Sequence, residues 1–157
     1  MRHQGGVSLI ELMVTVAVMA VLAAAGTPFA RGWMDSNRQM QARNLVWEGV
    51  SQARALALRN PGAVAAGDVA AWLERRGDAL QVKVTGGPQA PWNGTLPTGT
   101  TTQLADDSGN AVGDLACVAF DNRGSQVAGS GDCGGGADHH RIAIGFGDQE
   151  ALHVDLL

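Results

Sequence analysis

The chain has 157 residues, of which 45% are apolar and 17% are charged, with a formal net charge of −4. This length provides one domain and a little more. Residues 60–157 carry five basic and twelve acidic side chains, a net charge of −7, which argues against broad electrostatic attraction to nucleic acid. Residues 31–59 carry five arginines against Asp35 and Glu48, a net charge of +3, so only this segment can attract anions locally.

The N-terminus is short and basic, and a long apolar stretch follows it. The first six residues read MRHQGG, and the 19 residues from Leu12 to Ala30 carry no charge. About 20 apolar residues are needed to cross a bilayer as a helix, and Arg2 and Arg31 bracket this span. We therefore expect the short N-terminal flank to stay in the cytoplasm and the remainder to be exported. Two ordinary alternatives are a signal anchor and a secretory signal peptide cut near Ala23-Ala24-Ala25.

Neither alternative explains Glu11, a carboxylate at the edge of the apolar run. An ionisable group at this depth is expensive and needs a partner, unless it simply reaches to the membrane interface.

The segment Gly6-Val7-Ser8-Leu9-Ile10-Glu11-Leu12 resembles the processing site of the type IV prepilin family, which prepilin peptidase cuts after the glycine. The resemblance implies cleavage between Gly6 and Val7 on the cytoplasmic side, followed by N-methylation of Val7, which stands where the family usually has phenylalanine. Glu11 becomes fifth in the mature chain, where the family carries its glutamate. Pro28 becomes twenty-second, where many pilins have a helix-kinking proline.

The resemblance also gives Glu11 a role. Cleavage exposes a positive α-amine about one helical turn away, and an amine and a carboxylate attract strongly in a low dielectric. In the family, the glutamate of an incoming subunit is thought to meet the amine of its neighbour. Glu11 is then a docking charge for assembly.

The helical pattern continues to Arg59 and stops at Asn60-Pro61-Gly62, a strong break signal. Trp33, Met40 and Trp47 recur every seven residues, beside a stripe of Val46, Val50, Ala53 and Ala57. We expect this face to pack on the domain's own sheet. Arg31, Arg38, Arg43, Arg54 and Arg59 are expected on solvated or inter-subunit faces.

Strand patterns dominate after Pro61. Alternating or apolar runs predict strands at Ala79–Thr85, Leu115–Phe120, Arg141–Phe146 and Ala151–Leu157, whereas Val69–Arg76 fits a short strand or a short helix. Clusters of glycine, proline and asparagine predict loops at 86–99, 107–113 and 129–137. The fold class is therefore α+β, with a long N-terminal helix packed on an antiparallel sheet, as in pilins.

The order of these parts resembles the GspH/FimT group of minor pilins and pseudopilins, through the strand and turn Val118-Ala119-Phe120-Asp121-Asn122-Arg123-Gly124. Some members bind DNA through an arginine-bearing motif near the C-terminus. The matching region here, residues 147–153, has no arginine. DNA binding by that route is therefore doubtful.

The remaining residues give no sign of catalysis or of a cofactor. Cys117 and Cys133 are the only cysteines and form no CxxC pair; outside the cytoplasm they favour one disulfide, with two unpaired thiols as the alternative. His139, His140 and His153 fit structural or surface roles better than a metal site, since adjacent histidines on a strand point to opposite faces. Residues 106–110 lack the acidic spacing of a calcium loop, so a turn is expected.

These observations predict a prepilin leader at 1–6, a transmembrane and filament-core helix at 7–30, an exported helical half at 31–59 and a periplasmic β-rich domain at 60–157. The implied partners are prepilin peptidase, other pilin or pseudopilin subunits and the inner-membrane assembly platform. The sequence fits a minor type IV pilin best. A minor pseudopilin of a type II secretion system and a DNA receptor for uptake are the alternatives.

Overall fold

The structure is a computed structural model that describes residues 8–87, 90–129, 133 and 139–156, apart from the side chains of residues 28–30. The chain divides into two compact units, Met1–Met34 and Asp35–Leu157. One helix, α1 (Leu9–Arg59), contributes to both units, and all strands lie in the second.

Helix α1 ends where the sequence predicts. Asn60 adopts a left-handed backbone with φ 45°, and its amide N–H still bonds the carbonyl of Ala57 at 3.0 Å. Its side chain then accepts from the N–H of Val64 and donates to the Val64 carbonyl, which fixes the exit of the chain from the helix. Asparagine tolerates this conformation better than most residues.

The first sheet contains five antiparallel strands in the order β3-β2-β1-β6-β7. They are β1 (Ala71–Arg76), β2 (Ala79–Val84), β3 (Trp92–Thr95), β6 (Cys117–Phe120) and β7 (Gln126–Val127). The uncertain segment Val69–Arg76 is thus a strand, and it lies at the centre of this sheet between β2 and β6.

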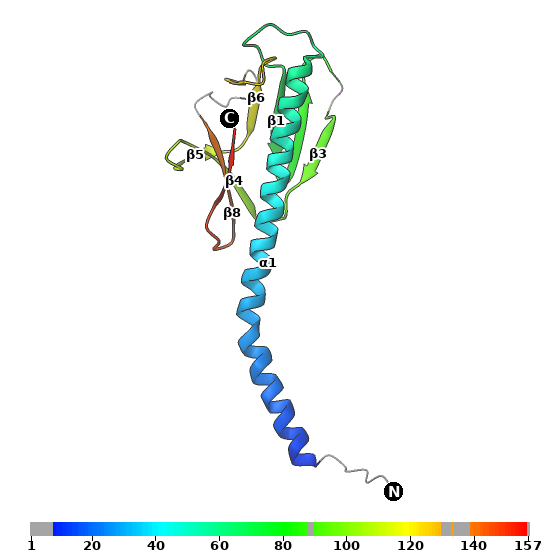
Figure 1. The fold of residues 1–157 in the computed structure, drawn as a ribbon, viewed down its shortest axis with the longest axis vertical. Coiled ribbons are helices and arrows are strands. Elements are labelled where there is room, and N and C mark those ends of the chain that lie inside the picture. Colours follow the sequence, from blue (N-terminus) through cyan, green and yellow to red (C-terminus); the bar gives the residue numbers. More distant parts are fainter. Residues whose placement is uncertain (1–7, 88–89, 130–132, 134–138, 157) are drawn as a thin grey trace. The chain divides into compact units, whose positions relative to one another are not determined.

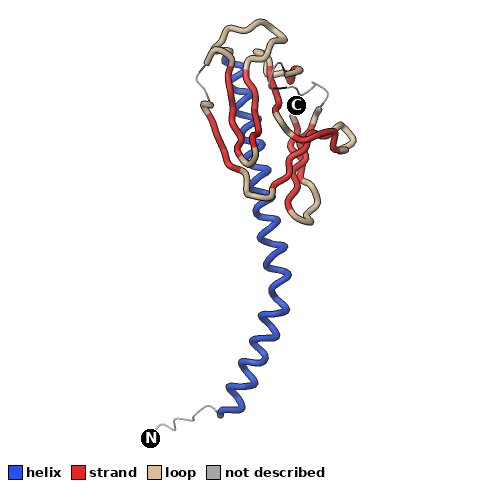
Figure 2. Tube along the Cα trace, turned by 180° about the vertical axis from the view of Figure 1, so that it is seen from behind, coloured by secondary structure: helices blue, strands red, loops and turns tan. Residues whose placement is uncertain are grey.

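The second sheet contains four antiparallel strands in the order β5-β4-β8-β9. They are β4 (Thr100–Ala105), β5 (Ala111–Asp114), β8 (Arg141–Phe146) and β9 (Leu152–Asp155). The chain leaves the first sheet after β3, forms β4 and β5, and returns as β6 (Figures 1 and 2).

The predicted loops at 86–99 and 107–113 were wrong in part, because they contain β3 and β5. Neither strand carries an apolar alternation: all four residues of β5 are exposed, and β3 includes Asn93 and Gly94. The partners β2 and β4 impose these strands through backbone hydrogen bonds. The predicted loop at 129–137 lies largely outside the described residues.

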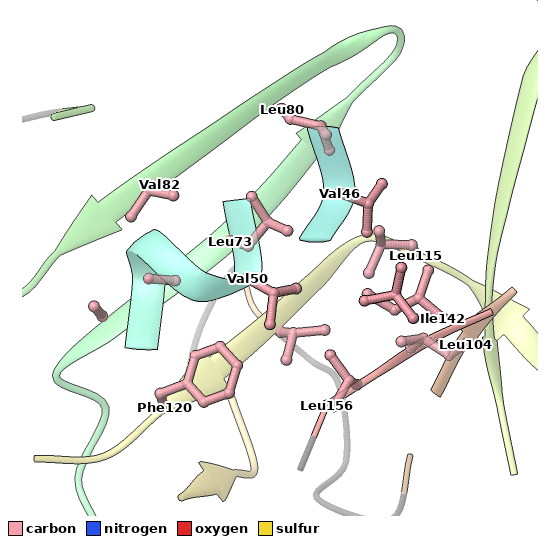
Figure 3. Packing of buried hydrophobic residues seen from close by; sticks show 14 of the residues in the cluster. Val46, Val50, Leu73, Leu80, Val82, Leu104, Leu115, Phe120, Ile142 and Leu156 are labelled. Carbon is pink, nitrogen blue, oxygen red and sulfur yellow. The ribbon is translucent and has the colours of Figure 1, made fainter. Parts of the chain in front are cut away.

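One hydrophobic core joins α1 to both sheets (Figure 3). Val46 and Val50 of α1 point toward Leu73 and Phe120 of the first sheet and Ile142 of the second. At Gly49 the helix approaches β1 so closely that a Cβ there would lie 2.8 Å from the Leu73 side chain. The fold is α+β and pilin-like, as the sequence predicts.

A smaller apolar cluster involves β6. It contains Cys117, Ala119 and Cys133, with Val69, Trp72 and Val127 against it. Cys117 and Cys133 form a disulfide with their Cα atoms 5.3 Å apart, which ties Cys133 to β6.

Candidate assembly site

The N-terminal part of α1 is apolar and has no contact that buries it. Its described side chains between Leu9 and Thr27 are all exposed, and its most apolar window has a mean hydropathy of 2.3 with 0% of it buried. The helix is long and apolar enough to cross a membrane. Glu11 lies in its first turn.

The polar groups within this segment bond to their own helix. The hydroxyl of Thr15 donates to the Leu12 carbonyl at 2.8 Å, and that of Thr27 donates to the Ala23 carbonyl at 2.9 Å. Such bonds satisfy hydroxyls that would be costly to leave unpaired in lipid. Among the described residues of this segment, Glu11 is the one charged group.

Three predicted site residues are not described by the structure, or are described only in their backbone. Gly6 and Val7, the expected cleavage and methylation sites, lie outside the described residues. Pro28 lies within α1, but its side chain is outside the description, so a kink there stays a prediction.

The second half of α1 buries one stripe and exposes its neighbour. Val46, Val50, Ala53 and Ala57 are buried, as expected, and Ala42 is buried with them. Met40, Trp47 and Leu58 are 54%, 59% and 57% exposed, and Trp33 in the first unit is also exposed.

The expectation that Trp33, Met40 and Trp47 pack on the domain's own sheet was therefore wrong. Each residue advances about 100° around a helix, so Trp47 stands a quarter turn away from the buried Val46. The seven-residue spacing correctly places these side chains on one side of the helix. It does not tell whether that side is buried or exposed. Met40, Trp47 and Leu58 form an exposed apolar stripe, which we call the α1 stripe.

The α1 stripe borders a shallow pocket of about 250 Å³ between the helix and the end of β9. Trp47, Ala55 and Leu58 supply its apolar wall, and Arg54 and Asp155 supply charges. Exposed apolar surface with a polar border is typical of a protein-interaction site.

Two of the helix arginines contact the C-terminal part of the chain; Arg43 is exposed, as expected, whereas Arg54 is half-buried. Arg54 donates to the carbonyls of Gly124 at 2.9 Å and Leu156 at 2.7 Å, and it lies 5.4 Å from the centre of the Phe120 ring. Arg43 donates to the His153 carbonyl at 3.3 Å. Arg43 thus binds a carbonyl of β9, and Arg54 ties the residue after β9 and the segment between β6 and β7 to the helix.

Residues 1–27 match the family model described as the prokaryotic N-terminal methylation motif. The chain therefore carries the N-terminal methylation motif of the type IV pilin and pseudopilin class. That class implies processing by prepilin peptidase and assembly with other pilins, and its members are typically structural proteins. No curated protein and no solved structure matches the chain.

The Asp35–Leu157 unit brings together few groups that suggest chemistry. Within the described part of the chain, no three histidine, cysteine or acidic residues gather as a metal site would require. His140 lies 3.9 Å from Asp107, while His139 and His153 are in no ion pair that the structure shows.

Residues 106–110 form a turn, as predicted. The carboxylate of Asp106 accepts from the backbone N–H of Asn110 at 2.8 Å. This hydrogen bond is the main reason that the pKa of Asp106 is lowered from its ordinary value. The carboxylate therefore fixes the chain reversal between β4 and β5.

Proposed function

We propose that this chain is a minor type IV pilin, a low-copy subunit that is processed by prepilin peptidase and helps to initiate or cap a filament. The observation that carries the proposal is the methylation motif at residues 1–27 leading into a helix whose apolar surface is unburied. The apolar surface of such a helix is buried in the membrane before assembly and against neighbouring helices in the filament.

The proposed mechanism begins at the leader. Cleavage between Gly6 and Val7 leaves a positive N-terminus, which is then methylated on Val7. Glu11 stands one turn into α1, and it meets the N-terminal amine of a neighbouring subunit as the helix leaves the bilayer. Each charge is costly to bury alone, so their pairing favours correct docking. The α1 stripe extends the helix contact beyond the membrane.

Chain organisation is part of the proposal. Residues 1–6 are the leader, residues 7–30 form the transmembrane and filament-core helix, residues 31–59 form the exported helical half, and residues 60–157 form the periplasmic domain. Before assembly the chain is a single-pass protein of the inner membrane that contacts the assembly platform. The disulfide between Cys117 and Cys133 suits an oxidising compartment of this kind.

The second candidate is a minor pseudopilin of a type II secretion system. The helix-and-sheet anatomy and the methylation motif support both machines equally. Deleting the gene and measuring twitching and secretion separates them: loss of twitching alone favours the pilus, and loss of a secreted enzyme alone favours the pseudopilus.

A DNA receptor is less well supported. Arg43 and Arg54, two of the basic residues that favoured it, are engaged with backbone carbonyls of their own domain. A gel-shift with the processed full chain in detergent, using linear duplex DNA, tests this alternative.

The decisive experiment is the intact mass of the chain expressed with and without prepilin peptidase. We expect loss of residues 1–6 and gain of one methyl group only when the peptidase is present, and neither change when Gly6 is replaced by valine. An uncut chain, or a cut near Ala25, contradicts the proposal.

A matched pair of variants tests the docking charge. Glu11→Gln should be cut normally yet enter sheared filaments poorly, because it cannot pair with the amine. Glu48→Gln, which makes the same chemical change in the exported half, should enter filaments as the wild type does. Equal incorporation of the two variants would remove Glu11 from the mechanism.

A further inference from the structure

A second surface of α1 lies on the side of the helix next to β3, whereas the α1 stripe borders β9. It is a pocket of about 340 Å³. Its lining residues are Arg38, Gln41, Thr95, Leu96, Pro97 and Thr98. None of them is acidic, and we call this surface the Arg38 pocket.

The Arg38 pocket presents a cation held by an aromatic ring. The guanidinium of Arg38 lies 5.8 Å from the centre of the Phe146 ring, and Phe146 itself is buried. None of the ion pairs among the described residues involves Arg38. Stacking on a fixed ring orients the guanidinium while leaving its N–H donors available.

The other polar groups of the pocket suit an anion of low charge. Gln41, Thr95 and Thr98 are exposed, and their amide and hydroxyl groups can donate hydrogen bonds beside the guanidinium. Nucleic acid is bound by neutralising many phosphates, and one arginine next to residues 60–157, which carry a net charge of −7, does not do this. A single carboxylate fits better, since arginine and carboxylate form strong charge-assisted hydrogen bonds.

The chain itself carries an exposed carboxylate on a fixed turn. The segment from Val84 to Asn122 has four aspartates and no basic residue. Within it, Asp106 is committed to holding the β4–β5 turn, while the side chain of Asp107 is 80% exposed. The Nε2 atom of His140 lies 3.9 Å from the Asp107 carboxylate.

The two surfaces lie on opposite flanks of the second unit. Figures 1 and 2 show β3, beside the pocket, on one side of the helix and the β4–β5 hairpin on the other. The Asp107 carboxylate therefore lies on the flank opposite the Arg38 pocket of its own subunit, but two copies side by side can bring the two together. Contacts between two different surfaces generate closed rings when the rotation between neighbours closes and open helical filaments when it does not.

We propose that the Arg38 pocket of one subunit receives the Asp107 carboxylate from the β4–β5 turn of a second copy. This contact rests on the proposed function and requires in addition that the initiating or capping complex holds two copies of this chain side by side. It adds a polar, domain-level contact to the helix packing and sets the orientation of adjacent subunits.

The test uses two full-length copies with different affinity tags, expressed with prepilin peptidase in a host that has no other pilins and solubilised in mild detergent. Capturing one copy should recover the other. Arg38→Glu in both copies, or Asp107→Lys in both, should reduce recovery about tenfold, because like charges are then juxtaposed. Recovery should return when one copy carries Arg38→Glu and the other Asp107→Lys.

Two control variants make the same charge changes elsewhere. Arg59→Glu alters the same helix away from the pocket, and Asp148→Lys alters a different exposed turn; both should leave recovery unchanged. Formation of the disulfide between Cys117 and Cys133, seen on a non-reducing gel, verifies that each variant has folded.

Three outcomes would overturn the contact: equal recovery for Arg38→Glu and Arg59→Glu, no rescue in the mixed pair, or loss of recovery on nuclease treatment, which would make the anion a phosphate. The mass of the same samples separates this failure from failure of the proposed function. A chain cut after Gly6 and methylated, but indifferent to these charges, retains the function and loses only the contact.

Discussion

The two units of this chain solve the burial of apolar side chains in opposite ways. In the Asp35–Leu157 unit, helix and sheets cover one another, so that Leu73, Phe120 and Ile144 are fully buried. In the described part of the Met1–Met34 unit, residues such as Leu9 and Leu22 face outward, 77% and 65% exposed. The second unit buries its apolar side chains within one chain. The first unit can bury its apolar side chains only in a membrane or against other helices.

This difference separates two meanings of stability. The second unit gains its free energy of folding from its own core, whereas the apolar helix gains its free energy from its surroundings. A large-to-small substitution in the second unit should therefore lower the free energy of unfolding of the domain. The same kind of substitution in the apolar helix should leave that free energy unchanged.

The largest effect is expected from Phe120→Ala. Removing a fully buried phenylalanine leaves a cavity and should lower the free energy of unfolding of the domain by about 4 kcal/mol. Leu22→Ala removes a similarly large side chain from the exposed helix and should leave that free energy unchanged. Denaturant unfolding of the full chain in micelles, followed by tryptophan fluorescence, measures both, and equal losses would refute the contrast.

Removal of the disulfide should have the next largest effect. Replacing Cys117 and Cys133, which are separated by 16 residues, with alanine should cost about 3 kcal/mol on the loop-entropy model. Reducing agent should lower the midpoint of the wild type to that of the double variant and leave the variant itself unaffected. A wild type insensitive to reductant would show that this link adds no stability to the second unit.

Arg54→Met should have an intermediate effect. The variant keeps the length of the side chain but loses hydrogen bonds to the Gly124 and Leu156 carbonyls, so it should destabilise the domain by about 2 kcal/mol. Arg59→Met, at an exposed position of the same helix, should cost less than about 0.5 kcal/mol. Faster hydrogen exchange in β9 of Arg54→Met would locate the loss, whereas equal stability of the two variants would contradict the tethering role.

The sequence predicts the features that local chemistry controls. The end of α1 at Arg59 follows from Asn60-Pro61-Gly62, and the bounds of β8 follow from the apolar run Arg141–Phe146. The match of residues 1–27 to the methylation motif agrees with the resemblance seen in the segment Gly6–Leu12. Each of these signals lies within a few residues of the feature that it predicts.

Features imposed from a distance were missed. β3 and β5 form because neighbouring strands offer free backbone groups, and no period in their own residues shows it. The exposure of Met40 and Trp47 depends on where the sheets meet the helix. Gly49 offered one usable signal, since a glycine in the middle of a helix is unfavourable unless something packs closely against it.

The smallest effect is expected at Glu74, which lies on β1 with a side chain only 9% exposed. Burial alone would raise its pKa, but hydrogen bonds from Lys83 and Arg76 outweigh burial and hold the pKa below its ordinary value of 4.5. Because the folded state depresses the pKa, ionised Glu74 stabilises the domain above pH 4.5, and this stability is lost as the pH falls through the lower, folded-state value. Glu74→Gln should cost about 1 kcal/mol at pH 7, and the cost should shrink as the pH falls below 4.5. Glu150→Gln, at an exposed glutamate, should show no such dependence. If the cost of Glu74→Gln did not change with pH, it would come from side-chain packing and not from the ionised carboxylate. The charge of Glu74 would then contribute nothing to the free energy of unfolding of the second unit.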